Sequence, residues 1–190
     1  QEMTDAQIIT ARPLHFGTPN AANLKEVSDA IKGAKRPVLV AGAGVLRSNA
    51  SDALRAFVDA TQIPLVTTFM AKGMLPKDHP QMLFSLGQPE EDIIDHALDA
   101  ADLIITVGFD PVEYGTSNLT KDQTPVVALS LISAPVDSGW HIVADAVGDL
   151  SKTLRHVKNH LGVQTWPPCP TFEAVRDGMI RNDKIGRAHV

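Results

Sequence analysis

Residues 37–44 read PVLVAGAG, a short apolar run that ends in two glycines separated by one alanine. A continuous apolar run of this length is typical of a β-strand that is buried on both faces of a parallel sheet. The glycines follow at the point where such a strand turns into a helix, and glycine allows the backbone to turn tightly there. This stretch therefore predicts a strand–turn–helix unit near the centre of an α/β sheet.

The rest of the chain alternates helical and strand patterns. Before residues 37–44, apolar residues recur at the spacing of a helix. After them we expect a second helix, with Leu54 and Phe57 on its inner face and Ser48 or Asn49 as its N-cap. Asp149 is the expected N-cap of the last helix of the sheet. We expect further strands at residues 63–68, 103–107, 126–129 and 141–144, a helix at 90–101, and a long loop over 71–89. Strands separated by helices indicate βαβ units, so the fold class predicted is α/β, a doubly wound, Rossmann-like parallel sheet flanked by helices.

Composition excludes several functions. The 190 residues fit one domain, and a net charge of -5 without a basic cluster argues against nucleic-acid and membrane-surface partners. No apolar run approaches the roughly 20 residues that span a bilayer. One cysteine, Cys169, permits no internal disulfide, which suits a reducing cytoplasm. We therefore expect a cytoplasmic chain.

The two ends look like cuts through linkers. The chain begins at Gln1, and a proline-rich stretch from Trp166 to Pro170 precedes a last amphipathic segment at 172–181. We expect residues 1–20 to be a linker from a preceding domain, 21–162 to be the domain itself, and 163–190 to lead toward a following domain. The last amphipathic segment would then belong to another part of a longer chain.

The pair Gly42 and Gly44 leaves two interpretations open. A dinucleotide-binding fingerprint has its first two glycines at these positions. The fingerprint also needs a third glycine, but this chain has Arg47 there. It needs an acidic residue at the end of the next strand as well, where this chain has Thr67 and Thr68. The sequence therefore departs from an ordinary NAD-binding site. The other interpretation is a tight turn that requires glycine for packing alone.

No catalytic set emerges from the residues alone. Asp110 and Glu113 follow Gly108 closely and could form paired carboxylates, although Glu113 could equally bind neighbouring backbone. His156 and His160 have the i, i+4 spacing of metal ligands, but no acid between them suits a zinc protease, and a solvated helix face is the simpler interpretation.

A succession of motifs resembles a known family. Residues 34–45 read AKRPVLVAGAGV, residues 63–68 read IPLVTT before AKG and LPKDHP at 71–80, and residues 101–108 read ADLIITVG. Together, over roughly residues 20–160, they resemble the central domain of thiamine-diphosphate-dependent enzymes, the group that includes acetolactate synthase. The segment from Gly108 to Tyr114 is similar to that of the catabolic, flavin-free acetolactate synthases, although their Trp-Asn pair after the tyrosine is absent here.

The resemblance implies a domain that cradles a cofactor without performing the chemistry. Thiamine diphosphate and magnesium belong to the parent enzyme, whose Gly-Asp-Gly motif and activating glutamate do not occur in this chain, and flavin is not expected. The implied partners are the flanking thiamine-binding domains, in a homodimeric or homotetrameric parent that condenses 2-oxo acids. The residues expected on the cradling edge are Gly42, Ala43, Gly44, Thr67, Thr68, Lys72, Gly73, Gly108, Phe109 and Asp110.

Three alternatives stay open from the sequence. The domain could bind FAD or an adenine nucleotide in another thiamine-diphosphate enzyme, such as an oxidase or decarboxylase. It could be a free-standing nucleotide-binding module for FAD, NAD or an adenosine phosphate. It could also be a vestigial domain that only separates its neighbours.

Overall fold

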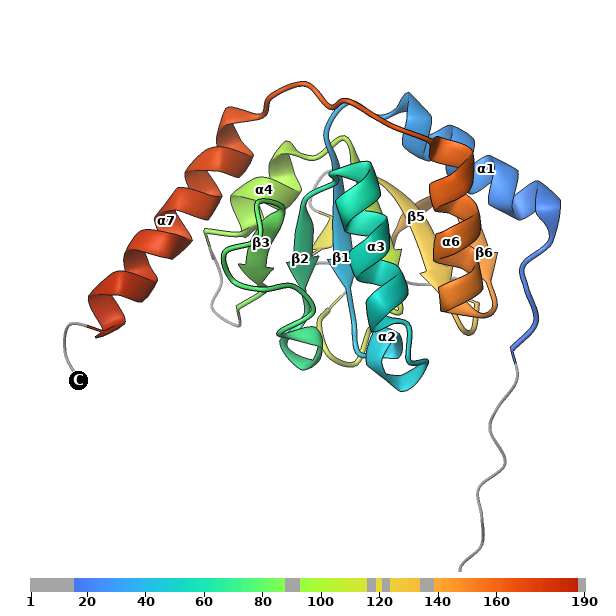
Figure 1. Ribbon diagram of the computed structural model, residues 1–190, viewed down its shortest axis with the longest axis horizontal. Helices are drawn as coiled ribbons and strands as arrows, with labels where there is room; N and C mark the ends of the chain where they lie inside the picture. Colours follow the sequence, from blue (N-terminus) through green and yellow to red (C-terminus); the bar gives the residue numbers. More distant parts are fainter. Residues whose placement is uncertain (1–15, 88–92, 116–118, 121–123, 134–138, 188–190) are drawn as a thin grey trace, which may run out of the picture.

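Six parallel strands form one sheet in the order β3-β2-β1-β4-β5-β6 (Figure 1). The computed structural model describes residues 16–87, 93–115, 119–120, 124–133 and 139–187. The strands are β1 (Pro37–Ala41), β2 (Leu65–Thr67), β3 (Met82–Ser85), β4 (Leu103–Val107), β5 (Pro125–Ser130) and β6 (His141–Val147). This architecture confirms the predicted doubly wound parallel sheet.

The order of the strands reverses between β1 and β4. The chain runs outward from β1 through β2 to β3 and then returns to β4 on the other side of β1, so adjacent loops leave in opposite directions there. The register between β1 and β4 is regular, with Val38 opposite Ile104 and Ala41 opposite Val107. Open parallel sheets bind ligands beyond the carboxyl ends of their strands at such a reversal.

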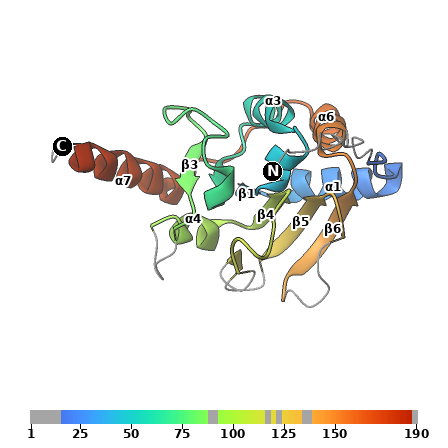
Figure 2. The ribbon, with the colours of Figure 1, turned by 90° about the horizontal axis from the view of Figure 1, so that it is seen from below.

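Three long helices cover one face of the sheet. They are α1 (Ala21–Gly33), α3 (Ser51–Thr61) and α6 (Leu150–Leu161), and they lie on the same side in the view from below (Figure 2). Leu39 of β1 and Ile105 of β4 are fully buried beneath them. Asp149 accepts a hydrogen bond from the Lys152 amide at 2.9 Å, which confirms it as the N-cap of α6.

The opposite face is covered by α4 (Asp95–Ala100) and by α7 (Pro170–Arg187). Phe172 and Val175 of α7 are buried in a core that also contains Val38, Val40 and Ile104. Figure 1 shows α7 beside β3 and α4, with its far end extending away from the sheet. The sequence placed this segment in another part of a longer chain, whereas its first half packs against this domain.

Two local predictions were wrong. The segment 71–89 was expected to be a loop, but it contains the edge strand β3 after the short 3-10 helix η1 (Phe69–Ala71). The helix α3 has Ala50 as its N-cap, because a separate short helix, α2 (Gly44–Arg47), ends at Ser48 and leaves Asn49 in a left-handed conformation with φ 53°. The predicted helix at 90–101 is observed over Asp95–Ala100, and its expected start lies outside the described residues.

Within the described residues, no helix combines the length and the apolar character that a membrane crossing requires.

Candidate functional site

Three glycines from two loops pack backbone to backbone at the reversal between β1 and β4. A Cβ atom on Gly42 would lie 2.6 Å from the carbonyl oxygen of Gly108, and one on Gly44 would lie 2.7 Å from the same atom. Gly108 itself has φ +56°, and a Cβ there would meet the Val45 amide nitrogen at 2.6 Å. Any side chain at these positions would collide with backbone atoms, so glycine is required here for packing.

The amide groups of both glycines in this turn already donate to backbone carbonyls. Gly42 N–H donates to the carbonyl of Val107 at 2.9 Å, and Gly44 N–H donates to the carbonyl of Gly108 at 2.9 Å. The helix that follows, α2, has only four residues. Diphosphate-binding loops depend on free amide groups at the start of a long helix. The second interpretation of the glycine pair, a packing turn, is therefore the one that the geometry favours.

A polar cluster joins the loops that follow β1, β2 and β4. The Arg47 guanidinium is 3.0 Å from the Asp110 carboxylate and 3.9 Å from Glu113. The Thr68 hydroxyl donates to the other oxygen of Glu113 at 2.6 Å. We call Arg47, Thr68, Asp110 and Glu113 the edge cluster. Asp110 and Glu113 are thus paired through an arginine, which the sequence had marked only as a departure from a fingerprint.

The two carboxylates of the edge cluster differ in environment. The Arg47 hydrogen bond, assisted by the Val112 amide, holds the pKa of Asp110 below its usual value. The Glu113 side chain is only 9% exposed, and its Oε1 atom has no hydrogen-bond partner. A buried carboxylate oxygen without a donor is costly. The cluster carries two carboxylates against one guanidinium and is therefore net negative.

A cavity of about 290 Å³ opens next to the edge cluster, at the carboxyl ends of β4 and β5. Phe109 and Trp140 form its aromatic wall, with ring centroids 5.2 Å apart and planes tilted by 54°. Arg47 and Asp110 line its polar side, and Thr106 and Ser130 also line it. We call this space the aromatic cavity. Trp140 was not among the residues that the sequence suggested, because it lies in a different loop from the signature motifs.

The remaining predicted edge residues are placed differently. Ala43 lies between the packed glycines and is buried. Thr67 is buried and its hydroxyl pairs with Ser85 of β3 at 2.8 Å, which directs it away from the edge cluster. Lys72 and Gly73 line a separate cavity of about 480 Å³ beside β3 and Met179. Gly42, Ala43, Gly44, Thr68, Gly108, Phe109 and Asp110 thus come together, while Thr67, Lys72 and Gly73 do not.

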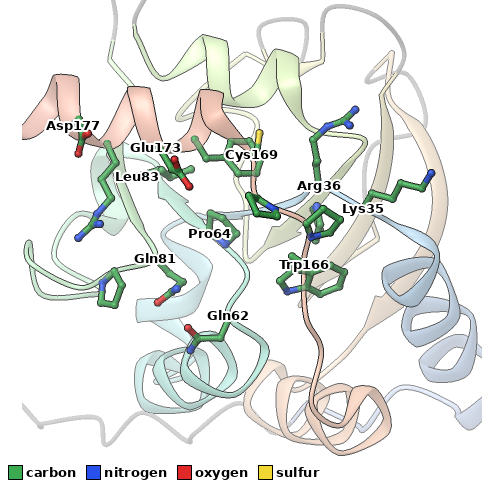
Figure 3. A pocket seen from close by; sticks show the side chains of 16 residues that line it. Lys35, Arg36, Gln62, Pro64, Gln81, Leu83, Trp166, Cys169, Glu173 and Asp177 are labelled. Atoms are coloured by element: carbon green, nitrogen blue, oxygen red, sulfur yellow. The ribbon is translucent and has the colours of Figure 1, made fainter.

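A third cavity, of about 470 Å³, lies at the opposite end of the sheet (Figure 3). The segment 166–177 folds over the start of β1 and the approach to β2 and β3 and forms its wall. The Trp166 indole donates to the Thr61 carbonyl at 2.6 Å and fastens this wall to α3. Cys169 is a free, buried thiol on the same wall. This cavity faces away from the strand ends where open parallel sheets bind ligands.

The histidines form no metal site in the described part of the chain, where no group of three or more His, Cys, Asp or Glu side chains converges. His156 and His160 stack on α6 with ring centroids 4.3 Å apart. His79 pairs with Asp59 at 2.9 Å in the loop before β3. These histidines therefore have local structural contacts.

Large apolar side chains are exposed along the carboxyl ends of the strands. Phe69, after β2, is 72% exposed, and Val112, after β4, is 93% exposed. Leu46 after β1, Met70 after β2 and Ile132 after β5 are also exposed. We call these five residues the apolar edge. Four separate loops, those after β1, β2, β4 and β5, contribute to it.

Fold and edge together define a doubly wound α/β domain with its candidate site at the strand reversal. The family model described as "Thiamine pyrophosphate enzyme, central domain" matches residues 24–157. The chain belongs to this family, which confirms the resemblance seen in the sequence.

Individual relatives agree with the family. The chain is 31% identical over 159 residues to an acetolactate synthase of Mycobacterium avium, with 78% of this chain and 26% of the relative covered. It is 31% identical over 132 residues to an acetolactate synthase of Bacillus subtilis, with 68% of this chain and 23% of the relative covered. The crystal structure of benzoylformate decarboxylase from Polynucleobacter necessarius superposes with a TM-score of 0.67 at 19% identity, over 87% of this chain and 32% of that one. That likeness shows the fold.

The chain spans about a quarter of the length of the curated relatives it matches. Magnesium is held in proteins by one or two carboxylates together with phosphate oxygens of the bound group. No group of three or more His, Cys, Asp or Glu side chains converges in the described residues, so their carboxylates do not form a metal site of the kind that a diphosphate cofactor would need.

Proposed function

We propose that this chain is the central domain of a thiamine-diphosphate-dependent enzyme that acts on 2-oxo acids, and that the parent activity is acetolactate synthase. The names of the relatives at 31% identity support the particular activity. The observation that carries the proposal is the apolar edge, because exposed side chains from four loops give the domain a surface for the thiamine-binding domains. The cofactor would supply the carbanion chemistry, and this domain would supply a wall and a docking surface.

The electrostatics of the site favour a flavin-free parent. A flavin dinucleotide carries a diphosphate, which needs free amide groups or unpaired cations. Here Gly42 and Gly44 donate to backbone carbonyls, and Arg47 is held by Asp110 at 3.0 Å. These contacts support the catabolic type of acetolactate synthase over a flavin-binding oxidase.

The activity is tested with the full protein encoded by the reading frame that contains these residues. Purified with thiamine diphosphate and magnesium, it should convert two molecules of pyruvate into acetolactate and carbon dioxide without added flavin. Release of acetaldehyde instead of acetolactate would redirect the assignment to a decarboxylase. A requirement for FAD would contradict the flavin-free type.

The docking role is tested by charge placed on the apolar edge. Phe69→Lys in the full protein should weaken assembly and lower the activity at least about tenfold, because a lysine cannot be buried without a partner. Val163→Lys is the matched control, since Val163 is 92% exposed and follows α6 at Gly162. Equal activity of both variants would argue against docking through this edge.

A further inference from the structure

The aromatic cavity shares only Ile132 with the apolar edge, so docking of the parent domains does not explain the aromatic and polar residues that line the rest of it. We propose that it binds a small, uncharged aromatic molecule with a hydrogen-bond donor, and that it excludes ligands that carry a diphosphate. This proposal stands whether or not the parent enzyme makes acetolactate.

The walls of the cavity suit a planar ring. Phe109 and Trp140 present tilted rings 5.2 Å apart, and Phe16, Leu131 and Ile132 line the space around them. Aromatic groups stack favourably on such rings in offset or edge-to-face arrangements, by about 0.5–1.5 kcal/mol beyond the area that they bury. A flat apolar molecule therefore gains from contact with the aromatic wall that these two rings form together.

The polar atoms in the wall prescribe a donor on the ligand. The Ser130 hydroxyl donates its hydrogen to the Ile132 carbonyl at 2.5 Å, so its oxygen remains able to accept. Thr106 makes a long contact of 3.5 Å to the Val127 carbonyl and also leaves its oxygen able to accept. An N–H or O–H group on the ring edge would match these acceptors.

The charges beside the cavity repel anions. Arg47 and Asp110 are the charged side chains that line it in the described part of the chain, and they neutralise each other at 3.0 Å. Glu113 lies behind them with its own charge, 3.9 Å from the same guanidinium. A diphosphate would have to displace Asp110 from Arg47 and then lie next to two carboxylates.

The volume of the cavity sets the size of the ligand. About 290 Å³ lies just below the roughly 300–1,000 Å³ that ligand pockets occupy. This space suits a one- or two-ring molecule and is small for a dinucleotide.

The proposal is tested by NMR titration of the ¹⁵N-labelled 190-residue chain with adenine and indole, both uncharged at neutral pH, and with ADP and FAD. We expect adenine or indole, at concentrations up to about 5 mM, to shift signals of the Phe109 loop and the indole N–H of Trp140. ADP should bind at least about tenfold more weakly than adenine, although it contains the same base. The proposal is overturned if ADP or FAD binds as tightly as adenine, or if neither adenine nor indole binds.

Two sets of variants test the aromatic side chains and the charged side chains separately. Trp140→Ala and the milder Phe109→Leu should each weaken adenine or indole binding at least about fivefold, whereas Phe69→Ala, outside the cavity, should not. Replacing both carboxylates, as Asp110→Asn with Glu113→Gln, should strengthen ADP binding relative to adenine binding about tenfold. Phe109→Leu preserves apolar volume and remains informative if Trp140→Ala fails to fold. Unchanged binding to Phe109→Leu and unchanged exclusion of ADP by the double variant would each overturn the proposal.

Discussion

The Thr68 hydroxyl donates a 2.6 Å hydrogen bond to the Glu113 carboxylate and so joins the loop after β2 to the loop after β4, across the end of β1. Thr68 is 1% exposed, and the Glu113 side chain is buried as well. The Glu113 carboxylate has one strong donor and a more distant guanidinium at 3.9 Å. At the strand reversal, this contact therefore adds a side-chain link between two loops to the backbone packing of Gly42, Gly44 and Gly108.

Thr68→Val removes the donor and keeps the shape of the side chain. We expect a loss of about 1.5–3 kcal/mol in the free energy of unfolding, because a buried carboxylate loses a hydrogen bond. Urea denaturation measures the change, and Thr18→Val at an exposed position is the control, with less than about 0.5 kcal/mol expected. If both variants lose the same stability, the contact contributes nothing specific.

Gly108→Ala should disrupt the glycine packing. The left-handed φ of +56° and the contact at 2.6 Å with the Val45 amide together predict a loss of roughly 2–6 kcal/mol. Gly33→Ala is the matched control, because a Cβ there meets nothing within 4 Å and alanine favours the helix by about 0.5–1 kcal/mol. A Gly108→Ala variant with an unchanged thermal midpoint would show that the loops after β1 and β4 can move apart without a loss of stability.

Asp110 makes stability depend on pH in a defined direction. Its pKa is lowered from 3.8 by the Arg47 hydrogen bond, so its contribution is complete above pH 3.8 and is lost as the pH falls through the lower folded-state pKa. The difference in stability between the wild-type chain and Asp110→Asn should be constant from pH 7 to about pH 5 and shrink below about pH 4. Glu26→Gln, on the exposed side of α1, measures the effect of net charge alone. A gap that widens toward acid would contradict the ion pair.

Trp166→Phe removes the indole donor that fastens the segment 166–177 to α3. The Thr61 carbonyl would lose its 2.6 Å hydrogen bond, at a cost of about 1–2 kcal/mol. We expect faster hydrogen exchange and faster limited proteolysis around residues 163–170 with little change in the sheet. Val163→Ala, at an exposed neighbouring position, serves as the comparison. Exchange rates that match in the two variants would mean that the indole bond does not hold the segment.

Most of the sheet was predictable because its central strands are apolar on both faces. Strands β1 and β4 are buried along their whole length, so their sequences are continuous apolar runs. Such a run can be recognised as a strand without knowing which strands lie next to it. The edge strand β3 was missed because it is short, lies between prolines and is only half-buried toward its end, at Phe84 and Ser85. A residue in an edge strand carries less of the burial signal on which such predictions depend.

The glycines of the site were predictable, and so was the place of Thr68, Phe109 and Asp110 at this edge, but the contacts between side chains were not. A tight turn requires glycine at that position, so the glycines can be recognised from the sequence alone. The contacts of Glu113 with Thr68, 45 residues away, and of Asp110 with Arg47, 63 residues away, depend on the order of strands. The fingerprint position occupied by Arg47 marked a departure from a dinucleotide site, but it did not identify the acidic partner 63 residues away.

The packing of Gly42, Gly44 and Gly108 has a consequence for how divergence within this family can be traced. These positions admit no side chain, so they cannot record which ligand a particular member has acquired or lost. The balance of charge at the strand reversal is set instead by the side chains at positions 47, 110 and 113. In comparisons among family members, the charge at these three positions can therefore vary independently of the glycines that the fold requires.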